Sequence, residues 1–187
     1  MSNVQKDNQT IDSQNYRPFA AQCANHSMHR VQRNDHCNVM ANQLITVLMG
    51  APGAGKSTWV RNNASGFEHI YNTEAVRINR DLDVGRYLYI ARLKAIAALE
   101  AGKDVIADGT HTIATHRLVW LRAAERLGID TQLIVFDTHW QICLDVQKGR
   151  EYPAPRSVVV NHCRNLKIQV RTAIAREGWG SIETITR

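Results

Sequence analysis

The sequence predicts an α/β fold, in which helices cover both faces of a mostly parallel β-sheet to form a three-layer sandwich. Two observations support this prediction. Short apolar runs rich in β-branched residues alternate along the chain with longer segments in which apolar residues recur at helical spacing. The first run, at 44–49, is apolar at every position except Thr46, which is typical of a parallel strand buried on both faces.

The elements are expected in a regular order from Leu44 onward. Strands are expected at 44–49, 75–78, 104–107 and 131–136, with an edge strand at 181–186. Helices are expected at 56–63, 84–101, 114–127, 140–148 and 156–177. Gly102 and Gly128 suit the ends of two helices, because glycine readily adopts the left-handed conformation that terminates many helices. Strands that alternate with helices imply parallel pairing, since parallel neighbours need a crossover connection.

Residues 1–42 differ from the rest of the chain in composition. They are rich in Asn, Gln, Ser and Asp, and their apolar residues follow no sustained period. Such a segment cannot bury enough apolar surface to offset the entropy of ordering it. We therefore expect a disordered polar tail over 1–42 and a folded domain over 43–187, with Met40 as a candidate start of the functional chain.

The composition narrows the class of protein. The net charge of +6 and the pI of about 9.4 favour a polyanionic partner such as nucleic acid, although many basic proteins bind none. The four cysteines form neither a C-x-x-C pair nor the dense spacing of a secreted disulfide framework. The sequence has no apolar run of the roughly 18 residues needed to span a bilayer and no signal-peptide pattern. We expect a cytoplasmic protein without a membrane partner.

A glycine-rich loop joins the first strand to the first helix and fits the pattern G-x-x-x-x-G-K-[ST]. Glycines let successive backbone N–H groups turn toward an anion, and the start of the next helix adds free N–H groups and a positive dipole end. Lys56 can reach the β- and γ-phosphates of a nucleotide, and the hydroxyl of Ser57 can ligate Mg²⁺. The sequence therefore predicts an ATP-binding loop of the P-loop NTPase type. Its residues are Gly50, Ala51, Pro52, Gly53, Ala54, Gly55, Lys56, Ser57 and Thr58.

Polar residues at the ends of the other strands are candidate partners of this loop, because ligands of open parallel sheets bind at the carboxyl edge. Asp81 and Asp108 each follow an apolar run. One carboxylate is suited to accept the proton of an attacking hydroxyl, and the other to organise the Mg²⁺ shell. Each residue is also suited to cap a helix or form a turn, since Asp is favoured at both.

Two basic segments follow the fourth strand. Residues 148–155 lie between two expected helices. In a kinase, such a segment closes over the nucleotide as a lid and places an arginine on the transferred phosphoryl group; the alternative is an ordinary surface loop. On the last long helix, Arg164, Lys167 and Arg171 form a basic stripe, which is either a solvated face or a surface for a phosphate backbone.

These motifs resemble, in order and spacing over about residues 44–177, the kinase domains of T-even phage polynucleotide kinases. The resemblance rests on the phosphate loop and on three later segments: Ile78-Asn79-Arg80-Asp81, Ile106-Ala107-Asp108-Gly109-Thr110, and the basic segment that ends at Pro155. The phosphate loop is common to many families, and Asn-Arg-Asp is the more specific element.

The resemblance implies a role for each matching residue. Lys56 and Ser57 would hold ATP and Mg²⁺, and Asp81 would be the general base on the acceptor hydroxyl. Asp108 would lie near the acceptor or the Mg²⁺. Arg150 would act from the lid on the γ-phosphoryl group.

The acceptor side departs from the family pattern. Val84 stands where the family has an arginine that binds the acceptor phosphate, and Arg86 is the nearest substitute. Arg80 and Asp108 complete the residues expected on the substrate side. The segment 108–111 reads Asp-Gly-Thr-His in place of the family's Asp-Thr-Asn, and no phosphatase domain is expected after the kinase motifs.

Three functions are consistent with these residues. The first is a DNA kinase, acting in the host cytoplasm if the protein is viral. Its acceptor would be the 5-hydroxymethyl group of a modified pyrimidine such as 5-hydroxymethyluracil, as in related phage kinases, or a 5′-hydroxyl end; we favour the hydroxymethyl group slightly. The second is a small-molecule kinase for a nucleoside or sugar. The third is a non-enzymatic nucleotide switch, which would not need Asp81.

Overall fold

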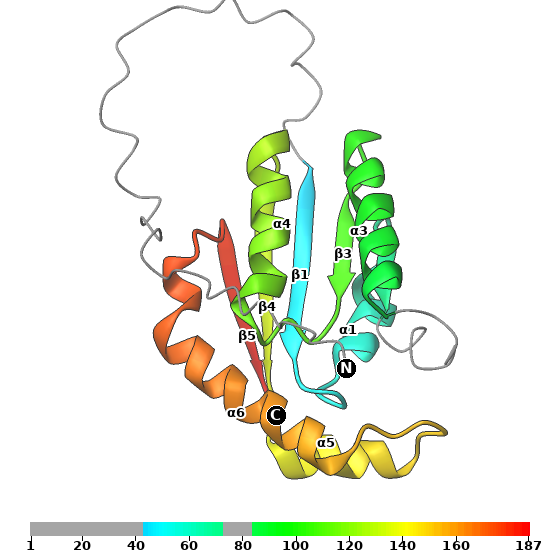
Figure 1. Ribbon diagram of the computed structural model, residues 1–187, viewed down its shortest axis with the longest axis vertical. Helices are drawn as coiled ribbons and strands as arrows, with labels where there is room; N and C mark the ends of the chain where they lie inside the picture. The colour runs from blue at the N-terminus through cyan, green and yellow to red at the C-terminus, as the bar shows by residue number, and fades with distance from the viewer. Residues whose placement is uncertain (1–42, 73–83) are drawn as a thin grey trace, which may run out of the picture. The chain divides into compact units, whose positions relative to one another are not determined.

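The computed structural model of the chain describes residues 43–72 and 84–187, with the side chains of 68–72 and 84–88 left out of the description. Its centre is a parallel sheet of five strands in the order β2-β3-β1-β4-β5 (Figure 1). The strands are β1 (Leu44–Gly50), β2 (Glu68–Asn72), β3 (Val105–Asp108), β4 (Asp130–Asp137) and β5 (Ser181–Thr186). The helices are α1 (Lys56–Asn63), α3 (Val84–Glu100), α4 (Ala114–Leu127), α5 (Trp140–Lys148), α6 (Arg156–Thr172) and the 3₁₀ helix η3 (Ile174–Arg176).

The side chains of the central strands alternate between two hydrophobic cores, which makes the three layers. On one face, Ile45, Val47 and Met49 of β1 pack with α3, α4 and the end of α6, through residues that include Ala95, Leu99, Trp120, Ala124 and Leu166. On the other face, Leu48 packs with α1, α5 and the start of α6, through residues that include Val60, Cys143, Val159 and Cys163. The predicted α/β fold with a parallel sheet is confirmed.

Most predicted elements lie where the sequence places them. The helices expected at 114–127 and 140–148 match α4 and α5, and the expected edge strand matches β5, which pairs in parallel with β4. Gly102 and Gly128 have φ values of 81° and 67°, so both adopt the left-handed conformation expected at a helix end. No helix among the described residues is long and apolar enough to cross a membrane.

Two elements differ from the prediction. Strand β2 at Glu68–Asn72 was missed, because its sequence Glu-His-Ile-Tyr-Asn interleaves polar residues as an edge strand does. The strand expected at 75–78 lies outside the described residues, as does the tail at 1–42. The helix expected at 156–177 is too long: α6 ends at Thr172 and the shorter turn η3 follows. Ala173 leaves helical geometry at φ −120°, and the chain then brings Glu177 to Arg117 of α4.

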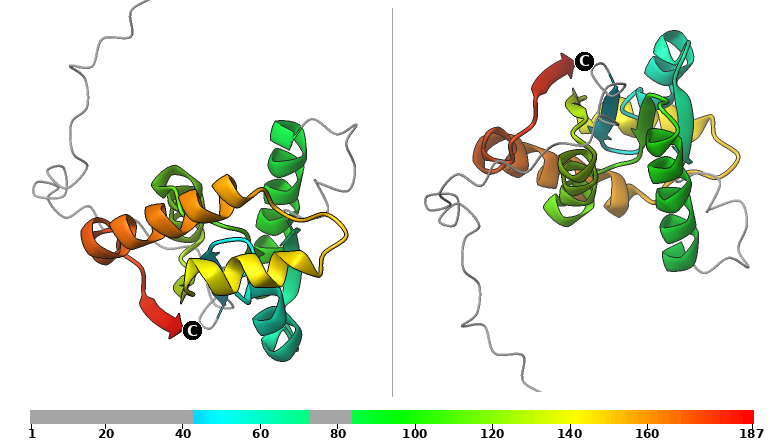
Figure 2. Two further views of the ribbon diagram at one scale, coloured as in Figure 1. Left: turned by 90° about the horizontal axis from the view of Figure 1, so that it is seen from below. Right: turned by 90° about the horizontal axis from the view of Figure 1, so that it is seen from above.

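The parallel register brings the ends of the central strands to one edge of the sheet. Gly50 of β1 aligns with Phe136 of β4, which aligns in turn with Ile185 of β5, and Asp108 of β3 lies opposite Leu48. The left view of Figure 2, seen from the side of these carboxyl ends, shows that α5 and α6 cross this edge. The phosphate loop follows β1 at this edge, and Asp108 is the last residue of β3 there.

Candidate functional site

The phosphate loop leaves the sheet at Gly50 and is fixed there by a tight backbone approach. The Gly50 N–H donates a 2.9 Å hydrogen bond to the carbonyl of Thr110. A Cβ on Gly50 would lie 2.9 Å from the Cβ of Phe136, closer than real Cβ contacts come. Glycine at this position therefore lets β1 and β4 stay paired up to the point where the loop begins.

The two other glycines of the loop have positive φ. Gly53 has φ 89° and Gly55 has φ 104°, a region in which side chains are strained. A Cβ on Gly53 would lie 2.5 Å from the carbonyl oxygen of Cys143, so α5 packs directly on the loop. Gly55 precedes α1, and no side chain among the described residues caps that helix. The N–H groups at the start of α1 are thus left for an anion.

The side chain of Lys56 folds back over the phosphate loop. Its Nζ donates hydrogen bonds to the carbonyls of Gly50 at 2.9 Å and Ala51 at 2.8 Å, and its side chain is buried. The ammonium is thereby held at the wall of the cavity that the loop forms. A cation fixed at this point suits the phosphates of a nucleotide, because charge-assisted contacts to phosphate strengthen where solvent is excluded.

Ser57 and Asp108 meet at the same wall. The Ser57 hydroxyl lies 3.5 Å from Oδ2 of Asp108, the buried last residue of β3. A hydroxyl and a carboxylate are both oxygen donors of the kind that Mg²⁺ prefers, so these two residues fit the ion expected here. Among the described residues, no three His, Cys, Asp or Glu side chains gather into a metal site. Phosphate and water oxygens are the other ligands that Mg²⁺ usually takes at nucleotide sites.

A cavity of about 160 Å³ lies over the loop and collects most of the predicted residues. Pro52 to Thr58 line it, together with Asp108 and Arg150, so the structure brings those predicted residues to one place. The sequence reasoning missed five lining residues, which are Thr110, Thr138, Ile142, Val146 and Arg187. Thr138 and Arg187 follow the ends of β4 and β5, so applying the strand-end rule to all five strands would have found both.

Arg150 lies at the start of the segment between α5 and α6, whose ends are tied together. Its N–H donates to the carbonyl of Gln147 at 3.1 Å. The side-chain oxygen of Gln147 accepts a 2.8 Å hydrogen bond from the N–H of Ala154 at the far end of the segment. Gln147 thus closes the segment into a compact loop that holds Arg150 at the cavity.

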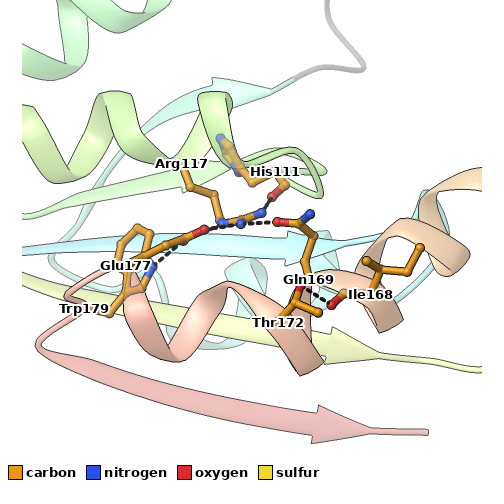
Figure 3. A network of polar contacts seen from close by, with 7 residues as sticks. All are labelled: His111, Arg117, Ile168, Gln169, Thr172, Glu177 and Trp179. Carbon is orange, nitrogen blue, oxygen red and sulfur yellow. Dashed lines mark hydrogen bonds and ion pairs between the residues drawn. The ribbon is translucent and has the colours of Figure 1, made fainter. Parts of the chain in front are cut away.

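A buried ion-pair network supports the segment that follows β3 (Figure 3). Arg117 of α4 is fully buried and contacts both carboxylate oxygens of Glu177, with Nε donating to Oε2 at 2.8 Å. Its two other nitrogens donate to the backbone carbonyl of His111 at 2.7 Å and to Oε1 of Gln169 at 2.8 Å. Trp179 donates to the same carboxylate at 3.0 Å. The guanidinium therefore joins α4, α6 and the segment that carries Asp108 and Thr110.

His111 is held neutral at the centre of this support. Its Nδ1 lies 2.8 Å from the carbonyl of Leu48, and its Nε2 accepts a 3.1 Å hydrogen bond from the indole of Trp120. One ring nitrogen must donate and the other must accept, which fixes the neutral Nδ1–H tautomer. Burial lowers the pKa of His111 to about 4, against the smaller opposing effect of its bond to Leu48. Its φ of 40° is the one positive value at a non-glycine residue among the described residues.

His162 of α6 joins the same segment from the other side. Its Nδ1 lies 2.6 Å from the hydroxyl of Thr112. Burial lowers the pKa of His162, and electrostatic interactions with Lys56 and His116 lower it further. The segment 109–113 is thus held by α4 on one side and α6 on the other, directly behind the cavity.

The predicted acceptor residues fall largely outside the described structure. Arg80 and Asp81 lie outside the described residues, and Arg86 belongs to α3 but its side chain is not described. Arg164, Lys167 and Arg171 are exposed on α6. The structure thus brings together the nucleotide side of the predicted site.

Comparisons with known proteins agree with this fold and loop. A family model described as an AAA domain (AAA_33) matches residues 45–169. A chain of the Pnkp1/Rnl/Hen1 RNA repair complex is 19% identical with a TM-score of 0.63, and the match covers 72% of this chain and 47% of that chain. The protein described here thus spans about half the length of that relative.

Two further solved structures have the same fold. A protein from Chloroflexus aurantiacus with a provisional assignment as a kinase is 13% identical with a TM-score of 0.55, over 78% of this chain and 88% of that chain. A chain of the PezAT chromosomal toxin–antitoxin system of Streptococcus pneumoniae is 15% identical with a TM-score of 0.53, over 79% of this chain and 69% of that chain. At these identities the similarity is one of fold. With the family match over most of the folded region, the chain belongs to the AAA_33 family of AAA domains, and its fold is of the P-loop kinase type.

Proposed function

We propose that the protein is an ATP-dependent kinase that transfers the γ-phosphate to a hydroxyl group on DNA. The favoured acceptor is the 5-hydroxymethyl group of a modified pyrimidine, 5-hydroxymethyluracil, as in phage DNA modification. The observation that supports transfer is that Lys56, Ser57, Asp108 and Arg150 line the same cavity. A phosphate loop by itself indicates only nucleotide binding, whereas an arginine that faces the loop is a feature of phosphoryl transfer.

Each residue has a defined part in this proposal. The loop N–H groups and Lys56 bind and orient the phosphates of ATP, and Arg150 stabilises charge on the transferred phosphoryl group. Ser57 and Asp108 would hold Mg²⁺, which neutralises phosphate charge when it is bound. Asp81 takes the proton of the acceptor hydroxyl as general base, and Arg80, Arg86 and Asp108 bind the acceptor. Transfer is direct and in line, with no covalent enzyme intermediate.

Three observations support a nucleic acid as the acceptor. The chain carries a net charge of +6, and the exposed stripe of Arg164, Lys167 and Arg171 suits a phosphate backbone. The Asn79-Arg80-Asp81 motif resembles that of phage polynucleotide kinases. One structural relative is a chain of an RNA repair complex, which favours a 5′-hydroxyl polynucleotide kinase as the second candidate function.

Two DNA duplexes separate these candidates. The first contains 5-hydroxymethyluracil and has both 5′ ends already phosphorylated; the second has the same sequence with thymine and carries free 5′-hydroxyl ends. With γ-labelled ATP, the favoured proposal expects label on the first duplex alone. Label on the second alone would assign the 5′-hydroxyl activity. Label on free nucleosides or sugars, with none on either duplex, would contradict the proposal that DNA is the acceptor.

The role of Asp81 needs a separate experiment. Asp81→Asn removes the proton acceptor while keeping the size and polarity of the side chain. We expect this variant to bind ATP as the unaltered protein does and to lose turnover. Transfer at the unaltered rate would show that another group is the base.

A further inference from the structure

Arg187, which follows the edge strand β5, is held by its backbone between two elements of the site. Its N–H donates to the carbonyl of Asp137 at the end of β4, at 3.4 Å. Its carbonyl accepts a 3.0 Å hydrogen bond from the N–H of His139, the residue that caps α5. The main chain of Arg187 is thus fixed where the sheet and α5 meet, next to the phosphate loop.

The side chain of Arg187 extends from this anchor over the loop. A Cβ on Gly55 would lie 3.1 Å from one terminal nitrogen of the guanidinium and 3.5 Å from its central carbon. The guanidinium therefore rests on the open face of Gly55, immediately before α1. It lines the same cavity as Lys56 and Thr58. Among the residues that the structure describes, no carboxylate forms an ion pair with it.

The position of Gly55 indicates which part of a nucleotide this cation would meet. In a phosphate loop the backbone N–H groups cradle the α- and β-phosphates, whereas the lysine reaches the β- and γ-phosphates. Arg187 lies over this backbone, at the residue where the loop enters α1. Arg150 approaches the same cavity from the segment between α5 and α6. The two arginines thus reach the cavity from different elements, and a planar guanidinium suits paired phosphate oxygens.

We infer that Arg187 is a nucleotide-binding residue whose guanidinium contacts the α- or β-phosphate of the bound nucleotide. The edge strand β5 then contributes to the phosphate site, although its own side chains are mostly exposed. This inference rests on the proposed nucleotide site and assigns it a residue beyond the phosphate loop and the lid.

The test measures equilibrium binding of Mg-ADP and of Mg-ATPγS by calorimetry, without turnover. Arg187→Ala and Arg187→Gln are compared with Arg122→Ala, which removes an exposed arginine of α4 that does not line the cavity. We expect both Arg187 variants to bind ADP and ATPγS more weakly by the same factor, roughly tenfold, because both nucleotides carry the α- and β-phosphates. Arg122→Ala is expected to change neither.

Three results would overturn the inference. Unchanged ADP affinity in both Arg187 variants would show that Arg187 does not contact the α- or β-phosphate. A loss of affinity for ATPγS alone would assign the contact to the γ-phosphate. Tighter ADP binding would mean that Arg187 competes with the nucleotide. Thermal unfolding without nucleotide shows whether the variants are folded, and the glutamine variant keeps the length of the side chain. Failure of the unaltered protein to bind either nucleotide would instead refute the proposed function, and the inference with it.

Discussion

The hydroxyl of Ser57 lies 3.5 Å from the carboxylate of Asp108, which joins the first turn of α1 to the end of β3. The two residues are 51 positions apart in the sequence and meet because β1 and β3 are neighbours in the sheet. The pair places two oxygen ligands beside the loop that would bind phosphates.

The carboxylate of this pair is expected to control the effect of Mg²⁺ on nucleotide binding. Asp108→Asn keeps the shape of the side chain and removes its charge. We expect the variant to bind ADP without metal about as well as the unaltered protein and to lose most of the increase in affinity that Mg²⁺ gives. Calorimetry with and without Mg²⁺ measures both quantities. An unchanged Mg²⁺ effect would show that Asp108 does not hold the ion.

The close approach of α5 to the phosphate loop predicts different effects at two glycines with the same backbone conformation. Gly53 and Gly66 have φ values of 89° and 91°, but only a Cβ on Gly53 would meet other atoms, of which the Cys143 carbonyl oxygen is nearest at 2.5 Å. Gly66→Ala carries the strain of positive φ alone, about 1 kcal/mol. Gly53→Ala adds a clash with backbone that cannot move without displacing α5.

We therefore expect Gly53→Ala to unfold at lower denaturant concentration than Gly66→Ala and, of the two, to be the variant that loses nucleotide affinity. Denaturant unfolding and ADP titration of the two variants measure these effects. Equal losses of stability in the two variants would mean that α5 moves aside at little cost. The conformation of the phosphate loop would then not depend on its contact with α5.

The buried pair of Arg117 and Glu177 is expected to dominate the stability of the segment behind the site. Removing one partner leaves the other charge buried without compensation, which costs about 3–5 kcal/mol. Glu177→Gln is the milder replacement and Arg117→Ala the harsher one. As a matched control, Lys148→Ala breaks the exposed pair with Asp145 and should cost at most about 1 kcal/mol.

Urea unfolding of the three variants gives the free energies of unfolding. A double variant of Arg117 and Glu177 should lose less stability than the two single losses added together, because neither charge is then left alone. Additive losses would show that the two side chains do not act as a pair.

The lowered pKa of His111 predicts that stability falls on acidification. The unfolded histidine has a pKa of about 6.5 and the folded one a pKa of about 4, so between these values the unfolded state binds more protons. Stability is then fully present above the unfolded pKa and is lost as the pH falls toward the folded pKa. For His111 alone this amounts to roughly 2 kcal/mol between pH 7 and pH 5.

Replacing His111 by asparagine tests this assignment, since asparagine tolerates positive φ and does not titrate. The difference in unfolding free energy between pH 7 and pH 5 should shrink in His111→Asn. A remainder is expected from His162, whose pKa burial also lowers. The same difference in the variant as in the unaltered protein would mean that His111 titrates normally.

The parts of the fold that follow local rules could be predicted from the sequence. The apolar run of β1 and the glycine that ends α4 at Gly128 act through burial and backbone conformation, which nearby residues determine. Strand β2 could not be recognised, because an edge strand with interleaved polar residues lacks the apolar run that marked the others. The end of α6 at Thr172 depends on Glu177 reaching Arg117, a contact across 60 positions.

The candidate site likewise has residues that local patterns predict and a residue whose position depends on distant contacts. The loop at Gly50–Ser57 has a local pattern whose geometry is dictated by its own glycines, so its position was predictable. Asp108 was predictable because strand ends share an edge. The end of the expected strand at 181–186 marks Arg187 as a candidate, but its place over Gly55 could not be predicted, because it depends on β5 pairing with β4 and on the bond to His139.

Transfer of labelled phosphate by the unaltered protein and by Lys56→Ala tests the central claim most directly. The two proteins are incubated with γ-labelled ATP and Mg²⁺ in the presence of the two DNA duplexes, RNA and free nucleosides. We expect label on DNA with the unaltered protein and a loss of at least about 100-fold with Lys56→Ala, because the ammonium at the cavity wall stabilises the transferred charge. Absence of label on every acceptor, or equal transfer by both proteins, would contradict a phosphotransferase site at this loop.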